Sequence, residues 1–158
     1  MANRVFVGLG SNLGDPAATV VTAAAQVATL GFGSRLSPLY RTEPQGGPAQ
    51  SAFCNAVLVF ETSWTATGLM VALQRIEQRF GRSRRIHWGP RTLDLDLLLF
   101  GDYVIKNALL TLPHPRMRDR RFVLEPLSEL APDLSMPDGQ PILRLLEKTR
   151  HQKVERWT

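Results

Sequence analysis

Hydrophobic and polar positions divide the first half of the chain into short strands and helices. The Val-rich run 4–9 predicts a strand that turns within the glycine-rich segment 8–15. Residues 17–30 are dense in Ala and follow Pro16, which is typical of a helix start, and Gly31 ends the pattern. A strand followed by a helix is therefore expected.

Two more strands and a loop follow. Residues 34–41 predict a strand that Pro38 weakens, so it should lie at a sheet edge or carry a bulge. The segment 43–51 contains two Pro and two Gly and is typical of a loop. Residues 53–61 are almost entirely apolar, which indicates a buried strand.

A second helix and a fourth long strand come next. Residues 65–80 place apolar side chains at helical spacing, and Gly81 closes the pattern. A basic loop is expected at 82–90. The run 93–100 (LDLDLLLF) alternates in its first half and is apolar in its second, as in a strand whose beginning opens on a cleft.

The order strand, helix, strand, strand, helix, strand predicts an α+β fold with a ferredoxin-like βαββαβ core, in which both helices cover one face of an antiparallel sheet. The rest of the chain forms a C-terminal extension. It should contain a short strand near Tyr103, a basic loop at 114–121 and helices at 122–130 and 142–148. No repeat or linker divides residues 1–158, so one domain is expected.

Composition places the chain among compact globular proteins. Its 158 residues are 44% hydrophobic and 21% charged, which excludes a disordered tail, and the length is too short for a protein kinase or a barrel. The single Cys54 excludes an internal disulfide. No apolar stretch approaches membrane-spanning length and no basic leader opens the chain, so we expect a cytoplasmic protein without membrane contact.

The net charge of +5 points to anionic partners. Of the 19 cationic residues 16 are Arg, which suits bidentate phosphate binding, although a genome rich in Arg codons would give the same count. The glycine run 8–15 reads G-x-G-x-x-x-G and is not the dinucleotide fingerprint; it is better explained as a tight strand-to-helix turn. No lysine follows a glycine, which excludes a P-loop.

The most informative pair is Asp94 and Asp96. At positions i and i+2 of a strand their carboxylates share one face and repel each other unless a cation lies between them. That cation could be Mg²⁺ or a neighbouring Arg in a structural ion network. The Arg-rich stretch 82–91 directly before the pair, and a second basic loop at 114–122, favour a metal-assisted polyphosphate site.

The ordered segments GSNLGD, YRTEP, FCNAV, GRSRR, WGPRTLDLDLLLFGD, LPHPRM and RRFVLEPL resemble the 6-hydroxymethyl-7,8-dihydropterin pyrophosphokinase family. The resemblance implies a ferredoxin-like fold and transfer of pyrophosphate from ATP to the pterin hydroxymethyl group, with release of AMP, in folate biosynthesis. It also implies two Mg²⁺ ions held by Asp94 and Asp96, with Asp96 helping to remove the hydroxyl proton.

The same resemblance assigns the remaining site residues. Catalytic roles fall to Arg82 and Arg91 together with Asp96. The implied ATP-binding residues are Gln74, Glu77, Arg84, Trp88, Arg91, Thr111, His114 and Arg120. The implied pterin-binding residues are Thr42, Pro44, Phe53, Asn55, Asp94 and Phe122.

Two other function classes remain open from the residues alone. A basic ferredoxin-like domain could bind RNA on its sheet, although the strand 53–61 lacks closely spaced aromatic side chains and the aspartates would repel phosphates. A different two-metal nucleotidyltransferase would release pyrophosphate instead of AMP. We expect ATP and the pterin as partners, no nucleic acid, and a monomer.

Overall fold

The computed structural model describes residues 1–44, 51–81 and 93–158. The predicted loop at 82–90 and most of the one at 43–51 lie outside these ranges. The strands are β1 (Asn3–Ser11), β2 (Phe32–Leu36), β3 (Tyr40–Thr42), β4 (Phe53–Thr62), β5 (Asp94–Phe100), β6 (Ile105–Lys106), β7 (Thr111–Leu112) and β8 (Glu155–Arg156). The helices are α1 (Pro16–Ala28), α2 (Ala66–Arg79), α3 (Arg121–Leu130) and α4 (Ile142–Lys148), with a 3₁₀ turn at Met117–Asp119.

The main sheet is antiparallel. In the described part of the chain its six strands run in the order β5-β1-β4-β3-β8, and β2 also pairs with β4. If β2 and β3 count as one interrupted strand, the four core strands lie in the order 4-1-3-2. This is the arrangement of a ferredoxin-like fold, so the predicted fold class is confirmed.

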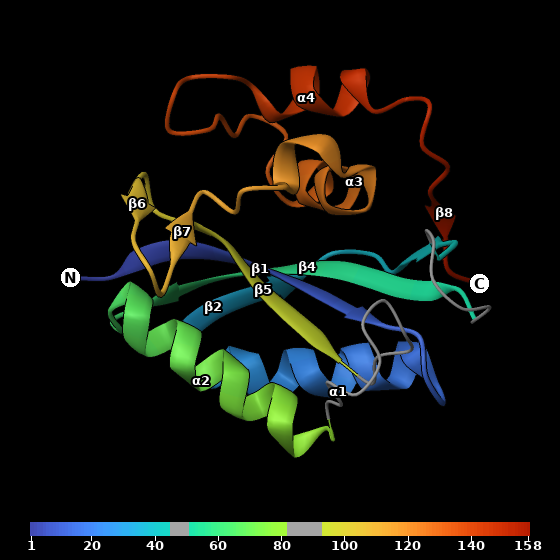
Figure 1. Cartoon of the computed structure of the whole chain (residues 1–158), viewed down its shortest axis with the longest axis horizontal. Coiled ribbons are helices and arrows are strands. Elements are labelled where there is room, and N and C mark those ends of the chain that lie inside the picture. Colours follow the sequence, from blue (N-terminus) through green and yellow to red (C-terminus); the bar gives the residue numbers. More distant parts are fainter. Residues whose placement is uncertain (45–50, 82–92) are drawn as a thin grey trace.

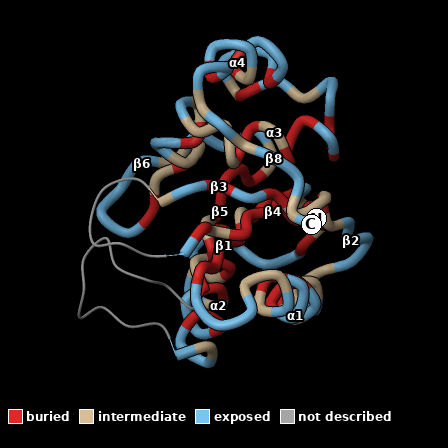
Figure 2. The backbone as a smooth tube through the Cα atoms, turned by 90° about the vertical axis from the view of Figure 1, so that its right-hand side faces the viewer, coloured by how far each residue is buried: buried red, intermediate tan, exposed pale blue. Residues whose placement is uncertain are grey.

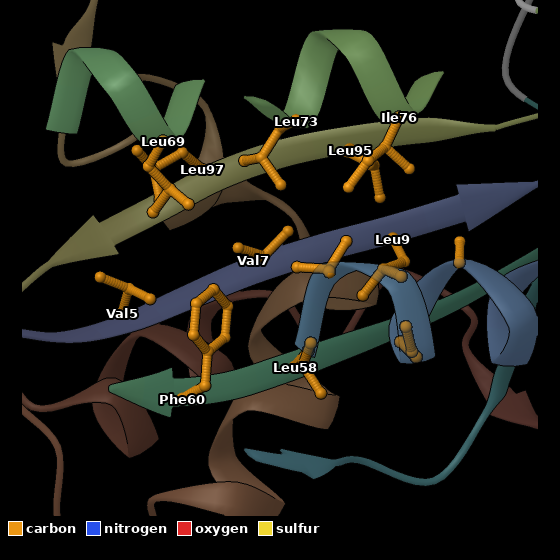
Figure 3. Packing of buried hydrophobic residues seen from close by; sticks show 14 of the residues in the cluster. Val5, Val7, Leu9, Leu58, Phe60, Leu69, Leu73, Ile76, Leu95 and Leu97 are labelled. Carbon is orange, nitrogen blue, oxygen red and sulfur yellow. The ribbon is translucent and has the colours of Figure 1, made fainter. Parts of the chain in front are cut away.

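The sheet has a hydrophobic cluster on each face. The helices α1 and α2 cover one face, as predicted, and α3 and α4 cover the other (Figure 1). On β1, Val5, Val7 and Leu9 point into the first cluster (Figure 3), whereas Phe6 belongs to the second. The C-terminal extension therefore buries the face that a bare βαββαβ core would leave exposed.

Local signals fix where the two core helices begin. Asp15 caps α1, because its carboxylate accepts a hydrogen bond of 3.2 Å from the Ala18 N–H. The Thr65 hydroxyl caps α2 by accepting one of 3.0 Å from the Gly68 N–H.

Buried positions concentrate where β1, β4 and β5 run through the middle of the molecule, between exposed outer helical turns (Figure 2).

Pro38 divides the predicted strand 34–41 into β2 and β3. Pro38 has no N–H to donate to the sheet. The preceding residue, Ser37, makes two hydrogen bonds to β4. The Ser37 N–H donates to the Val57 carbonyl, and the Ser37 hydroxyl accepts from the Val57 N–H, both at 2.9 Å. The irregular register of β2 on β4 agrees with the predicted edge or bulge.

Two predicted strands differ from the structure by about two residues, and one strand was missed. The first strand continues to Ser11, two residues beyond its predicted end at Leu9, so Gly10 lies in the strand and the turn follows at residues 12–15. Tyr103 lies in a turn, and the short strand begins two residues later, where β6 pairs with β7. Strand β8 was not predicted at all, because two polar residues carry no periodic signal and pair with β3 only through the tertiary path of the tail.

Leu127→Ala should show that the second cluster is part of the core. Leu127 is fully buried on α3, so its truncation should lower the free energy of unfolding by about 2–5 kcal/mol. Leu143 on α4 is 51% exposed and serves as the matched control, with an expected change below about 0.5 kcal/mol. Urea unfolding of both variants measures this, and equal losses would contradict it.

Candidate functional site

A cleft of about 950 Å³ opens on the α3 side of the sheet, where β1 ends and β4 and β5 begin. It brings together the predicted residues Thr42, Pro44, Phe53, Asn55, Asp94, Asp96, His114, Arg120 and Phe122. These residues come from three strands, two loops and one helix. The fold therefore gathers most of the described residues that the sequence singled out.

Two glycines form the floor of this cleft. Gly10 pairs with Asp94 on one side and Asn55 on the other, and Gly8 pairs with Asp96 and Val57. A Cβ atom on Gly10 would lie 2.9 Å from the Asn55 Oδ1 atom. The glycines thus leave an open trough between the carboxylates of β5 and the amide of β4, which replaces their predicted role in a tight turn.

The two aspartates lie on the cleft face of β5, while the alternating Leu95 and Leu97 are buried in the α2-side cluster. The Asp96 side chain is 48% exposed. Between the aspartates, the Leu95 N–H donates a hydrogen bond of 2.8 Å to the carboxylate of Glu77 on α2. This contact fixes the start of β5 from the opposite face of the sheet.

Glu77 is therefore placed differently from its predicted neighbours. It is 4% exposed and does not line the cleft, and Gln74 lies exposed on the same helix outside the cleft. Thr111 on β7 is also outside the cleft. ATP binding by these three residues stays a prediction. Arg82, Arg84, Trp88 and Arg91 lie outside the described residues.

A basic wall faces the carboxylates. The His114 Nε2 atom lies 3.9 Å from the Asp96 Oδ1 atom, and the Arg116 N–H donates to His114 Nδ1 at 3.2 Å. An Nδ1 that accepts a hydrogen bond leaves the proton on Nε2, pointing toward Asp96. Burial lowers the pKa of His114, and the nearby cations Arg120 and Arg116 lower it further, against the attraction of Asp96. His114 is therefore a neutral donor near pH 7.

Arg120 and Arg116 carry the positive charge of this wall, and Arg120 interacts with both aspartates. Burial lowers its pKa, with Arg116 acting in the same direction, while Asp96 and Asp94 raise it. An arginine pKa lies so far above neutrality that the side chain stays charged. The Arg120 Cζ atom lies 5.4 Å from the centre of the Phe122 ring, which holds the cation beside an aromatic face.

Across Gly10 from Asp94 lies Asn55, which with Phe53 and Phe122 gives the cleft an amide and aromatic surface. The Asn55 Nδ2 atom donates a 2.7 Å hydrogen bond to the Thr42 hydroxyl, and Asn55 is only 6% exposed. Phe53 and Phe122 are partly buried at the cleft. A flat ring with polar edges could stack on these phenylalanines and be recognised at its rim by the amide.

Sequence reasoning missed one wall of the cleft. It is formed by residues 151–154 of the C-terminal tail, and Arg116 and Asp119 also line the site. Arg116 lies in a basic loop that the sequence did indicate. The tail carried no signal, because its position depends on pairing between β8 and β3, far away in sequence.

Comparison with known proteins identifies the family. The model of the 7,8-dihydro-6-hydroxymethylpterin-pyrophosphokinase family matches residues 6–132. A 2-amino-4-hydroxy-6-hydroxymethyldihydropteridine pyrophosphokinase of Pseudomonas aeruginosa is 43% identical, with 99% of this chain and 98% of the relative covered. The protein of that name from Haemophilus influenzae is 39% identical over 94% of both chains.

Among solved structures, the HPPK-DHPS of Plasmodium falciparum with pteroate superimposes with a TM-score of 0.73 at 15% identity, covering 94% of this chain. The chain spans 42% of that longer protein, and this likeness shows the fold alone. No described helix is long and apolar enough to cross a membrane. The family match and the full-length relatives confirm the resemblance expected from the sequence: the chain belongs to the 7,8-dihydro-6-hydroxymethylpterin-pyrophosphokinase family.

Proposed function

We propose that this cleft transfers pyrophosphate from ATP to the hydroxymethyl group of 6-hydroxymethyl-7,8-dihydropterin and releases AMP. Family membership supports the overall reaction, a step of folate synthesis. One observation supports the location of the reaction: paired carboxylates, a cationic wall and an aromatic surface with a fixed amide line the same cleft.

The donor set of the cleft fits Mg²⁺. This ion prefers oxygen ligands and usually takes one or two carboxylates, with substrate phosphates and water completing its shell. Asp94 and Asp96 supply those carboxylates, and no cluster of three or more metal-ligating side chains occurs among residues 1–44, 51–81 and 93–158. In this proposal the ion binds together with the nucleotide, whose phosphates complete its shell. When bound, Mg²⁺ neutralises phosphate charge and acidifies a coordinated hydroxyl.

Three residues of the cleft have separate roles in the transfer of the pyrophosphoryl group. A carboxylate oxygen of Asp96 accepts the proton of the pterin hydroxyl group while the hydroxyl oxygen attacks the β-phosphorus. The bond from the β-phosphorus to the oxygen that bridges it to the α-phosphorus breaks, and AMP leaves with that oxygen. Arg120 and the Nε2–H of His114 stabilise negative charge on the transferring group.

The pterin occupies the aromatic side of the cleft in this proposal. Phe53 and Phe122 stack on the ring, and Asn55, held by Thr42, hydrogen-bonds its edge. The carbonyl and amide groups around Pro44 complete the rim. An RNA-binding alternative is disfavoured, because α3 and α4 cover the sheet face that such a module would use.

Two Mg²⁺ ions held by Asp94 and Asp96, a monomeric state and a cytoplasmic location complete the proposal.

Release of AMP tests the proposed reaction. The protein should form AMP from ATP only when Mg²⁺ and 6-hydroxymethyl-7,8-dihydropterin are both present, and Asp96→Asn should lower kcat by roughly 10²–10⁴-fold, the usual contribution of a positioned base. Asp94→Asn should cause a comparable loss. Chromatography of the nucleotides measures this, with exposed Asp102→Asn as the control. Release of inorganic pyrophosphate in place of AMP would instead indicate a nucleotidyltransferase.

The protonation of His114 should make stability pH-dependent. Folding lowers the pKa of His114. Above the ordinary histidine pKa of about 6.5 the side chain is neutral in both the folded and the unfolded protein, so it adds no pH dependence to stability there. Below that pH the unfolded chain binds a proton that the folded protein does not, so stability falls with acidification. His114→Gln should flatten the decline of Tm between pH 7 and pH 5.5. An unchanged slope in calorimetric scans would contradict the neutral assignment.

Gly10→Ala should weaken pterin binding through Asn55. The added Cβ would displace the Asn55 amide, and a lost hydrogen bond worth about 1 kcal/mol corresponds to roughly fivefold in affinity. In an Asn55→Ala background the same substitution should have no further effect. Pterin titrations by calorimetry measure both steps, and equal losses in the two backgrounds would show that Gly10 acts by another route.

A further inference from the structure

We propose that Gln152 is a positioning residue for Arg120: its side-chain amide ties together the peptide groups on either side of that arginine. The Gln152 Nε2 atom donates to the Asp119 carbonyl at 2.6 Å, and the Arg121 N–H donates to Gln152 Oε1 at 2.9 Å. The role of Arg120 toward phosphate rests on the proposed function.

The backbone of Arg120 joins the 3₁₀ turn to α3: its N–H donates to the Met117 carbonyl, and its carbonyl accepts from the Val123 and Leu124 N–H groups. Arg120 follows the 3₁₀ turn at Met117–Asp119 and is the N-cap of α3, with φ −117° and ψ 105°, but it makes no side-chain cap hydrogen bond. Arg121 is the first residue of the helix, and its N–H has no partner within the helix. Gln152 supplies that missing cap from a distance of 31 residues in the sequence.

The tail that carries Gln152 is itself anchored. The Arg121 guanidinium donates back to the Gln152 carbonyl at 2.8 Å and to the Arg150 carbonyl at 3.3 Å, while Glu125 orients it at 3.0 Å. Further along, Arg156 lies 2.9 Å from a Glu129 carboxylate oxygen. The tail is therefore anchored both at residues 150–152 and at Arg156, and this fixes the backbone that carries Gln152.

We call these two Gln152 hydrogen bonds the clip. They suit a residue whose charge must be held in one position. A partly buried guanidinium interacts strongly with phosphate oxygens, and that interaction depends steeply on the position of the cation. Fixing the two peptides next to Arg120 limits where its side chain can reach. Without the clip the arginine would still be present but less well placed.

Gln152→Met tests the inference, because methionine keeps the shape of the side chain and removes both hydrogen bonds. We expect the affinity for MgATP, measured by calorimetry, to fall about five- to tenfold, and pterin affinity to stay within twofold. Gln152→Glu should behave like the methionine variant, since it retains an acceptor for Arg121 but places an oxygen against the Asp119 carbonyl. Unchanged MgATP affinity in both variants would overturn the proposal.

A double-mutant cycle separates positioning from the other possible roles. Gln152 itself lines the cleft, so it could touch the nucleotide directly. If it acts through Arg120, Gln152→Met should have less than a twofold effect on MgATP affinity in an Arg120→Met background. A full five- to tenfold loss in that background, from direct contact or general loosening, would contradict the proposal.

Gln140→Met is the matched control. The Gln140 Oε1 atom accepts a 2.6 Å hydrogen bond from Arg118, which lies in the same basic loop as Arg120, but neither Gln140 nor Arg118 lines the cleft. MgATP affinity should stay at the wild-type value, and a loss equal to that of Gln152→Met would reject a specific role for the tail. Because binding is read independently of turnover, failure of wild-type protein to release AMP would refute the proposed function without deciding this one.

Discussion

Repulsion between two carboxylates on one strand face is the constraint around which this site is built. Asp94 and Asp96 must remain charged and accessible at the start of β5, although the other side of that strand is buried against α2. Glu77 meets this demand from the buried side, because its hydrogen bond to the Leu95 N–H anchors the strand without occupying the cleft. The strand is thus fixed in position while its carboxylates stay open to a ligand.

The glycines of β1 complete this arrangement. Any side chain at Gly10 would lie between the carboxylates and Asn55 and would crowd the amide directly. With only backbone there, two chemically different surfaces face each other across an open trough. One side bears charges suited to a metal-bound phosphate, and the other bears the rings and amide suited to a flat heterocycle. The spacing of the sheet therefore sets how far apart two reactants are held.

The sequence predicted the parts of this structure that depend on local pattern. Apolar periodicity and the Pro and Gly signals at their ends located α1 and α2, and the alternation at 93–100 correctly placed both aspartates on one face. Gly10 was misjudged as part of a turn, since a glycine required by a close approach in a strand has the same local signature as one required by a turn. The wall at residues 151–154 was missed, because its position depends on long-range pairing of β8.

The arginine excess shows why composition alone is a weak guide to a binding site. Among the described arginines, only Arg116 and Arg120 line the cleft. Others use their forked donors within the fold: Arg35 donates to the Leu130 carbonyl, and Arg118 bridges Gln140 and Asp138. A guanidinium can satisfy several acceptors at once, which suits it to joining a C-terminal extension to a sheet as well as to binding phosphate. Part of the positive charge that suggested an anionic ligand therefore contributes to holding the extension in place, and the site gains from it indirectly, because Arg121 on α3 anchors the tail.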